Sequence, residues 1–189
     1  MFRTLLDSHL DCLRSLSSLE QPLVEIARRL LASLSAGRKI LICGNGGSAA
    51  DSQHFAAELV GRFRRERRGW PAIALTTDTS ILTAVANDYG YERVFARQVE
   101  ALGKPGDVLV GLSTSGNSEN VRLAVREARA LGMESVGLLG RDGGTLKEEV
   151  THPVVVTSPV SARVQEAHIF ILHFWADFLD QELSSEVSK

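Results

Sequence analysis

The sequence has little of what marks several broad classes of protein. It holds two cysteines in 189 residues, Cys12 and Cys43, and no CxxC motif; this is typical of buried thiols in a reducing compartment rather than of a disulfide framework. No stretch reaches the roughly 18 apolar residues of a membrane span. The first residues, MFRTLLDSHLDCL, lack the apolar core and cleavage site of a signal peptide. We therefore expect a cytoplasmic protein without a membrane partner.

An excess of charge of one sign is missing as well. The formal net charge is -2, from 21 basic and 23 acidic residues. Proteins dedicated to nucleic acids usually carry a basic excess, so we expect no nucleic-acid partner, whereas a local site for a small phosphorylated molecule stays open. The length, with 44% hydrophobic and 23% charged residues, fits a single domain over residues 1–189.

Residues 1–36 predict a helical extension of this domain. A second helical stretch begins at Pro22, a favoured first-turn position, and Gly37 ends the extension. Its apolar stripe either covers the core of the domain or packs against another subunit. The stripe recurs at helical spacing and consists of Leu5, Leu6, Cys12, Leu13, Leu16 and Leu19.

From Lys39 onward, short apolar runs alternate with longer helical patterns. Apolar runs of this kind are typical of strands buried on both faces of a parallel sheet. The alternation predicts an α/β fold, a three-layer α/β/α sandwich with a five-stranded parallel sheet, which binds ligands beyond the carboxyl ends of its strands. The predicted strands are Lys39–Cys43, Ala72–Leu75, Val108–Leu112, Ser135–Leu139 and Pro153–Val156. The predicted helices are 48–61, 79–101, 118–131, 144–149 and 163–183.

Three segments after these strands and helices are candidates for binding an anion. Ser113–Ser118 has four hydroxyl residues in six positions before a helix that Ser118 is placed to cap, which favours a phosphate site over an ordinary capping loop. Gly44–Ser48 is glycine-rich but fits neither a P-loop nor GxGxxG, so a simple tight turn stays open. The five arginines of Arg62–Arg68 indicate either a solvated loop or, through Arg62, a contribution to a phosphate site.

Two pairs of polar residues on predicted helices suggest acid–base or metal chemistry. His54 and Glu58 are four apart and share a helix face, as a general base with its partner, two metal ligands or a surface pair would. Gln165 and His173 are eight apart, about 12 Å along a helix and about 80° around it. One ion would hold both only if they lean inward or come from two subunits. Glu166 and His168 beside them are expected to be exposed or structural.

Together these segments resemble the sugar isomerase (SIS) domain family and, within it, the phosphoheptose isomerases. The resemblance covers nearly the whole chain and rests on CGNGGSAADSQHFAAEL, VANDYGYERVF, GLSTSGNSENV and ARVQEAHIFILH. It implies a flavodoxin-like SIS domain and an aldose–ketose isomerase that converts D-sedoheptulose 7-phosphate to D-glycero-D-manno-heptose 7-phosphate through an enediol. That reaction is the first step toward ADP- or GDP-heptose precursors, as used for lipopolysaccharide.

The resemblance also implies roles for individual residues. Glu58 matches the catalytic base, and His173 matches the catalytic acid. A homotetramer with active sites between subunits is implied as well. The implied phosphate loop is Ser113, Thr114, Ser115 and Ser118; the other implied substrate contacts are Asn45, Gly46, Gly47, Glu58, Asn87, Asp88 and Gln165; and the implied ligands of one zinc ion per subunit are His54, Glu58, Gln165 and His173. Some family members carry an acidic residue where this chain has Ala162, so a role for that carboxylate does not transfer.

Other activities share this scaffold. A non-catalytic SIS-domain regulator that binds the replication initiator protein would share the stretch at Ser161–Glu166, and a sugar-phosphate sensor would keep the serine loop. Neither needs Glu58 and His173, which favours the enzyme. A related lyase acting on a muramic acid phosphate is expected to be longer.

Overall fold

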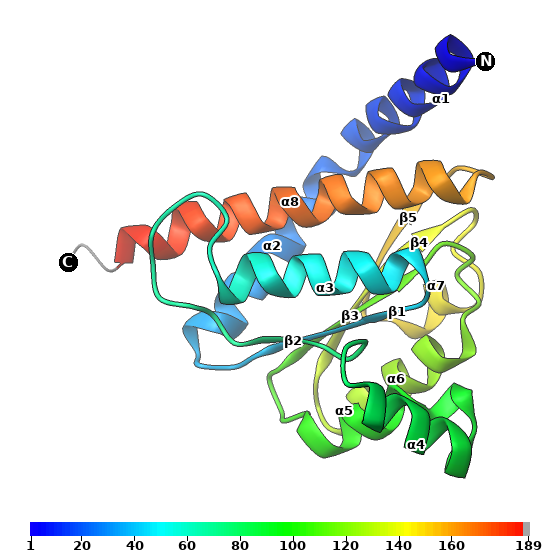
Figure 1. Cartoon of the computed structure of the whole chain (residues 1–189). Helices are drawn as coiled ribbons and strands as arrows, with labels where there is room; N and C mark the ends of the chain where they lie inside the picture. Colours follow the sequence, from blue (N-terminus) through cyan, green and yellow to red (C-terminus); the bar gives the residue numbers. More distant parts are fainter. Residues whose placement is uncertain (187–189) are drawn as a thin grey trace.

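The described residues form a five-stranded parallel sheet between two layers of helices (Figure 1). The computed structural model describes residues 1–186, with side chains for residues 1–182, so the last three residues of the predicted domain lie outside it. The strands are β1 (Ile40–Gly44), β2 (Ala72–Ala74), β3 (Val108–Ser113), β4 (Glu134–Gly140) and β5 (His152–Val156). Their order is β2-β1-β3-β4-β5, and all neighbours are parallel. The predicted sandwich is therefore confirmed, with strand limits shifted by one or two residues.

The central strands are apolar because helices cover them on both sides. Every residue of β1 and of β3 is buried, and the two strands pair with Ile42 opposite Val110. Side chains on alternate faces belong to two separate cores: Ile42 packs in one and Leu41 in the other. This rigid centre holds the loops that follow β1 and β3 in fixed positions.

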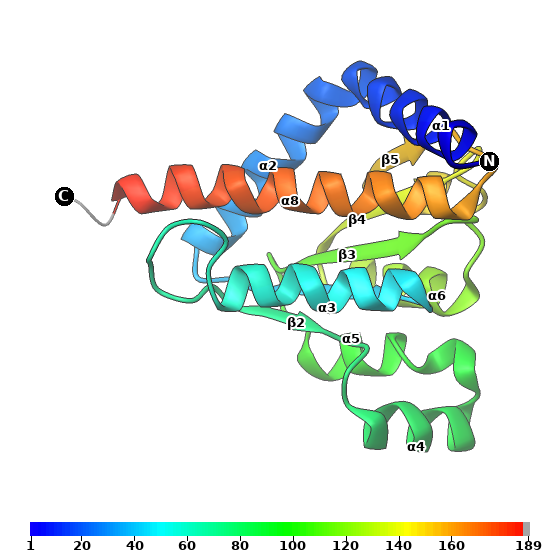
Figure 2. The same ribbon diagram turned by 45° about the horizontal axis from the view of Figure 1, so that its top comes forward.

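The helices divide between the two faces of the sheet, as Figures 1 and 2 show. The core of the first face receives apolar side chains from α2 (Glu20–Ser35), α3 (Gly47–Val60) and α8 (Ser161–Glu186), with α1 (Phe2–Ser15) packed along α8. The core of the second face receives them from α4 (Thr79–Tyr89), α5 (Ala96–Leu102), α6 (Glu119–Ala130) and α7 (Leu146–Glu149). Two short 3-10 helices, η1 (Leu16–Leu19) and η2 (Tyr91–Arg93), join neighbouring helices. None of the helices formed by the described residues is both long and apolar enough to cross a membrane.

Two details differ from the helical predictions. The single helix predicted over 79–101 is broken, because Gly90 has a φ of 89° and ends α4, a conformation that glycine adopts without strain. The extension at 1–36 is helical as predicted, yet within the described chain no residue of α1 is buried. Phe2 and Leu5 are 78% and 53% exposed, so the apolar stripe of α1 does not cover the core of its own domain.

Candidate active site

The carboxyl edge of the sheet places two of the predicted loops side by side. The strand order reverses between β1 and β3, and doubly wound folds bind ligands at such a switch point. Asn45 follows β1, and its side-chain amide exchanges two hydrogen bonds of 2.8 Å with that of Asn120 in α6. The Tyr91 hydroxyl donates to Asn45 Oδ1 at 3.1 Å. These contacts tie the glycine-rich loop after β1 to the hydroxyl loop after β3.

The hydroxyl loop, residues 113–118, gathers its side chains at the start of α6. Ser113 Oγ lies 2.8 Å from Ser118 Oγ and 3.5 Å from Ser115 Oγ, with Thr114 between them in the chain. Ser118 is the N-cap residue of α6, as predicted, but among the described residues its side chain makes no capping hydrogen bond. The first N–H groups of α6 therefore remain available. Clustered hydroxyls and free N–H groups at a helix N-terminus suit a phosphate group.

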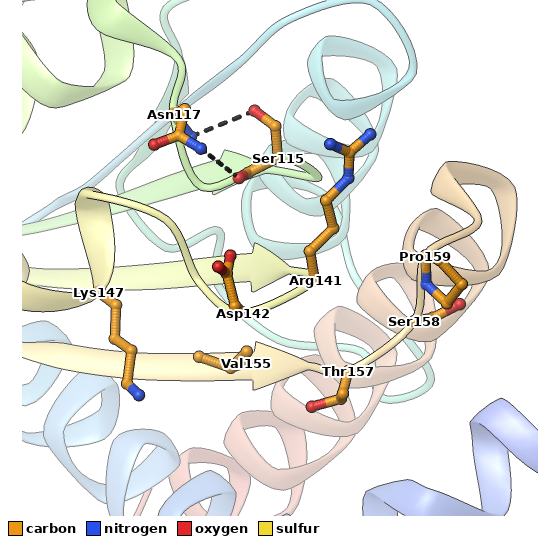
Figure 3. A pocket seen from close by; sticks show the side chains of 9 residues that line it. All are labelled: Ser115, Asn117, Arg141, Asp142, Lys147, Val155, Thr157, Ser158 and Pro159. Atoms are coloured by element: carbon orange, nitrogen blue, oxygen red, sulfur yellow. Dashed lines mark hydrogen bonds between the residues drawn. The ribbon is translucent and has the colours of Figure 1, made fainter.

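A cavity of about 930 Å³ opens beside the hydroxyl loop, on the side of β4 and β5. Figure 3 shows the Arg141 side chain running toward Ser115, whereas Lys147 points away from that loop. Arg141 has a φ of 60°, the one positive value outside glycine in the described chain. The lining residues are Ser115, Asn117, Arg141, Asp142, Lys147, Val155, Thr157, Ser158 and Pro159.

A second group of polar side chains forms where α3 and α8 run side by side. His54 Nε2 lies 2.8 Å from His173 Nε2 and 3.3 Å from Glu58 Oε1, which confirms that His54 and Glu58 share a face. The side chains of His54 and Glu58 are 44% and 21% exposed. Burial lowers the pKa of His173, His54 lowers it further and Glu58 opposes the shift. At neutral pH this group therefore presents an acceptor carboxylate beside a neutral His173.

The three side chains fit a divalent metal ion. One ligand atom each from His54, Glu58 and His173 all lie within 4.8 Å of one another. Two imidazole nitrogens and a carboxylate oxygen are a common zinc ligand set, and the ligand atoms of a tetrahedral zinc stand about 3.3 Å apart. The observed separations of 2.8 and 3.3 Å are close to that value, so only a small opening of the histidine pair is needed.

Gln165 is placed apart from this cluster. Its side-chain amide lies against Gly47, where a Cβ atom would collide with it, and Gly47 precedes His54 by seven residues, about 10 Å along α3. One chain therefore does not bring Gln165 and His173 together, as the helix geometry indicated. Asn87 and Asp88 are exposed in the last turn of α4 and hydrogen-bonded to each other at 2.8 Å.

Two neighbours of the cluster were missing from the sequence predictions. Asp51 stands one turn before His54, and its Oδ2 is buried with no hydrogen-bond partner among the described residues. Burial raises the pKa of Asp51, and His54 opposes the shift. Spacing i, i+3 on the His54 face was the signal that pointed to it. The Phe63 ring stacks on His173 with centroids 5.6 Å apart and planes at 29°, and no local pattern indicates that contact.

The remaining candidates are structural or exposed. His168 is fully buried against the Leu139 carbonyl, and burial lowers its pKa to about 4, which confirms its structural assignment. Glu166 bonds to His9 Nδ1 at 2.7 Å. Arg62 forms an exposed pair with Glu66 at 3.5 Å, so nothing in its contacts links it to the phosphate loop. Cys43 is fully buried, as expected.

Fold and hydroxyl loop together are those of a SIS domain, and the SIS domain family matches residues 6–140. The chain is 55% identical to the phosphoheptose isomerase of Geotalea daltonii, over 95% of this chain and 94% of that protein. Its structure matches those of the phosphoheptose isomerases of Francisella tularensis, with a TM-score of 0.93, 37% identity and coverage of 96% and 97% of the two chains, and of Neisseria gonorrhoeae, with a TM-score of 0.86, 44% identity and coverage of 96% and 100%. The chain belongs to the phosphoheptose isomerases of the SIS domain family.

Proposed function

We propose that this protein is a cytoplasmic aldose–ketose isomerase that converts D-sedoheptulose 7-phosphate to D-glycero-D-manno-heptose 7-phosphate, the first step toward ADP- or GDP-heptose precursors. The observation that carries the proposal is the cluster of His54, Glu58 and His173, with its ligand atoms within 4.8 Å. A binding module or regulator has no need of such an acid–base group. The names of its close relatives support the same reaction.

The hydroxyl loop anchors the substrate phosphate. Ser113, Thr114, Ser115 and Ser118 donate hydrogen bonds from their hydroxyls, and the free N–H groups of α6 add the positive end of the helix dipole. Sugar hydroxyls then lie over the adjoining glycine-rich loop, where Asn45, Gly46 and Gly47 approach closely. Asn87 and Asp88 contribute further hydrogen bonds to the sugar.

The cluster on α3 and α8 carries the proton transfer. Glu58 takes a proton from one of the two carbons at the carbonyl end and returns it to the other, and His173 donates to or accepts from the carbonyl oxygen. The lowered pKa of His173, caused by burial and by His54, keeps its imidazole neutral near pH 7. A neutral ring can both give and take a proton as the enediol forms and collapses.

His54, Glu58 and His173 would hold a zinc ion, with Gln165 of a second subunit as the further ligand. A bound zinc ion supplies a Lewis acid that polarises the carbonyl oxygen. Gln165 is assigned to a second subunit because its own chain keeps it beside Gly47, about 10 Å along α3 from His54. Glutamine is an unusual zinc ligand, so its contribution is expected to be weaker than that of the other three.

Reach argues that the complete site needs two subunits of the proposed homotetramer. Glu58 comes eleven residues after Gly47, about 16 Å along α3 at 1.5 Å per residue. An extended heptose phosphate spans roughly 9 Å from its carbonyl carbon to phosphorus, over seven bonds of about 1.25 Å projected length. The hydroxyl loop is tied to the start of α3 through Asn45 and Asn120. The loop of one chain therefore serves the Glu58 of another.

Incubation with sedoheptulose 7-phosphate, followed by NMR, tests the reaction directly. The wild-type protein should form the aldose, whereas Glu58→Gln should lower kcat by about 10²–10⁴-fold, the usual worth of a general base, and still bind substrate. Glu66→Gln removes an exposed carboxylate of the following loop, whose side chain is 88% exposed, and should leave the rate unchanged. A wild-type protein that forms no aldose, or a Glu58→Gln variant with a near-normal rate, would contradict the assignment.

A further inference from the structure

The arginine-rich segment after α3 is tied into the fold instead of lying free in solvent. In Figures 1 and 2 this arginine loop, residues 61–70, arches from the end of α3 over α8. Arg67 Nε donates to Asp180 Oδ1 of α8 at 2.7 Å, and the two side chains are 3% and 1% exposed. The other oxygen of Asp180 accepts the N–H groups of Arg64 and Arg65 at 2.7 and 2.9 Å. The prediction of a solvated loop is thus wrong for Arg67.

The same guanidinium closes the end of α3. Arg67 Nη2 donates to the Glu58 carbonyl at 2.8 Å, and Nη1 donates to the carbonyls of Leu59 and Gly61 at 2.9 and 3.0 Å. The last carbonyls of a helix have no partner within it, so a side-chain donor there prevents fraying. The Trp70 ring lies 3.5 Å from the guanidinium carbon and covers its other face. Arg67 therefore fixes the turn of α3 that carries the Glu58 side chain.

The arginine loop also reaches the other half of the cluster. Phe63, four residues before Arg67, stacks its ring on His173 at 5.6 Å between centroids. Asp180 stands two turns beyond His173 on α8, so the loop meets α8 at both positions. One short segment thus contacts the Glu58 backbone on α3 and the His173 ring on α8.

We propose that the arginine loop is a strap that sets the position of Glu58 relative to His173, with Arg67, Asp180 and Phe63 as positioning residues. Its catalytic meaning rests on the proposed isomerase function. Its geometric meaning does not, because the strap equally sets the spacing of three candidate zinc ligands. Loss of such outer contacts typically weakens metal binding about 10–100-fold.

The chain offers a matched control at the other edge of the sheet. Asp107, at 1% exposed, accepts the N–H groups of Lys39 and Lys104 at 2.9 Å each and pairs with Lys39 Nζ at 2.6 Å. Like Asp180, it is a buried carboxylate held by two N–H groups and one cation. Lys39→Met and Arg67→Met therefore remove comparable buried charges, but only Arg67 contacts the end of α3 that bears Glu58.

The test compares these two variants by thermal unfolding, by zinc affinity from competition with a chromophoric chelator, and by kcat and KM for sedoheptulose 7-phosphate. Both variants should unfold at lower temperature. Arg67→Met should also bind zinc about tenfold or more weakly and lose kcat in step, with KM within about twofold because the hydroxyl loop is intact. Lys39→Met should keep wild-type zinc affinity and kcat. Equal losses in both variants, or none in Arg67→Met, would overturn the proposal.

Phe63 gives a second test that does not depend on a folded Arg67→Met protein. Phe63→Leu keeps an apolar side chain but removes the stacked ring, and should weaken zinc binding about three- to tenfold. Phe63→Tyr should restore the affinity, and unchanged affinity in Phe63→Leu would count against the strap. If the wild-type protein binds zinc but forms no aldose, the proposed function fails while the zinc affinities still decide the role of the strap.

Discussion

The hydroxyl loop and the His54–Glu58–His173 cluster are built in opposite ways. The loop takes its hydroxyls from six consecutive residues, Ser113–Ser118, at the end of a buried strand. The cluster joins His54 to His173, which are 119 positions apart in the sequence, on the facing sides of two long helices. One is a local structure that anchors a ligand, and the other depends on how two helices pack. Binding and proton transfer can therefore be disturbed separately.

The largest effect expected on the cluster side, apart from Glu58→Gln, comes from removing the metal. Chelation should lower kcat by at least about 100-fold, since polarising a carbonyl oxygen is worth several kcal/mol, and added zinc should restore it. Binding of inorganic phosphate should not change, because the hydroxyl loop contains no metal ligand. Activity that survives chelation, with metal content verified by mass spectrometry, would remove zinc from the account.

The loop side should respond in the opposite sense. Ser118→Ala removes a hydroxyl that lies 2.8 Å from Ser113 Oγ, and should raise KM roughly tenfold or more, as expected for a hydrogen bond to a charged group, with kcat little changed. Thr77→Ala is the matched control, because its hydroxyl also follows a strand but donates to the Ala74 carbonyl at 3.3 Å. Steady-state kinetics of the three proteins would decide, and a kcat loss without a KM change in Ser118→Ala would contradict a binding role.

A smaller effect separates the two histidines of α8. Burial lowers the pKa of His168 to about 4 in the native state, whereas an unfolded histidine titrates near 6.5. Between these values the unfolded chain binds more protons, so this residue's contribution to stability is complete above about pH 6.5 and is lost as pH falls toward 4. His168→Leu should therefore flatten the decline in unfolding free energy over that range, by up to about 3 kcal/mol. Urea unfolding of both proteins at several pH values measures it, and parallel curves would refute it.

What the sequence predicts follows the same division. Ser113–Ser118 and the His54/Glu58 pair were predicted because each signal lies within six residues, and strand patterns such as Val108–Leu112 reflect burial on both faces. The contact of Arg67 with Asp180 joins residues 113 positions apart, and five arginines in seven positions gave no sign of which one is buried. The break at Gly90 was overlooked because apolar spacing continues across it.

The central claim is that the loop of one chain serves the cluster of another, and hybrid oligomers test it most directly. Ser118→Ala and Glu58→Gln chains are unfolded together, refolded as a mixture, and assayed below the wild-type KM. Random pairing should give about a quarter of the sites an intact loop and an intact cluster from different chains. Activity should then rise well above that of either variant alone, toward a quarter of the wild-type rate. A mixture no more active than the sum of its two components would show that each chain supplies both halves of its own site.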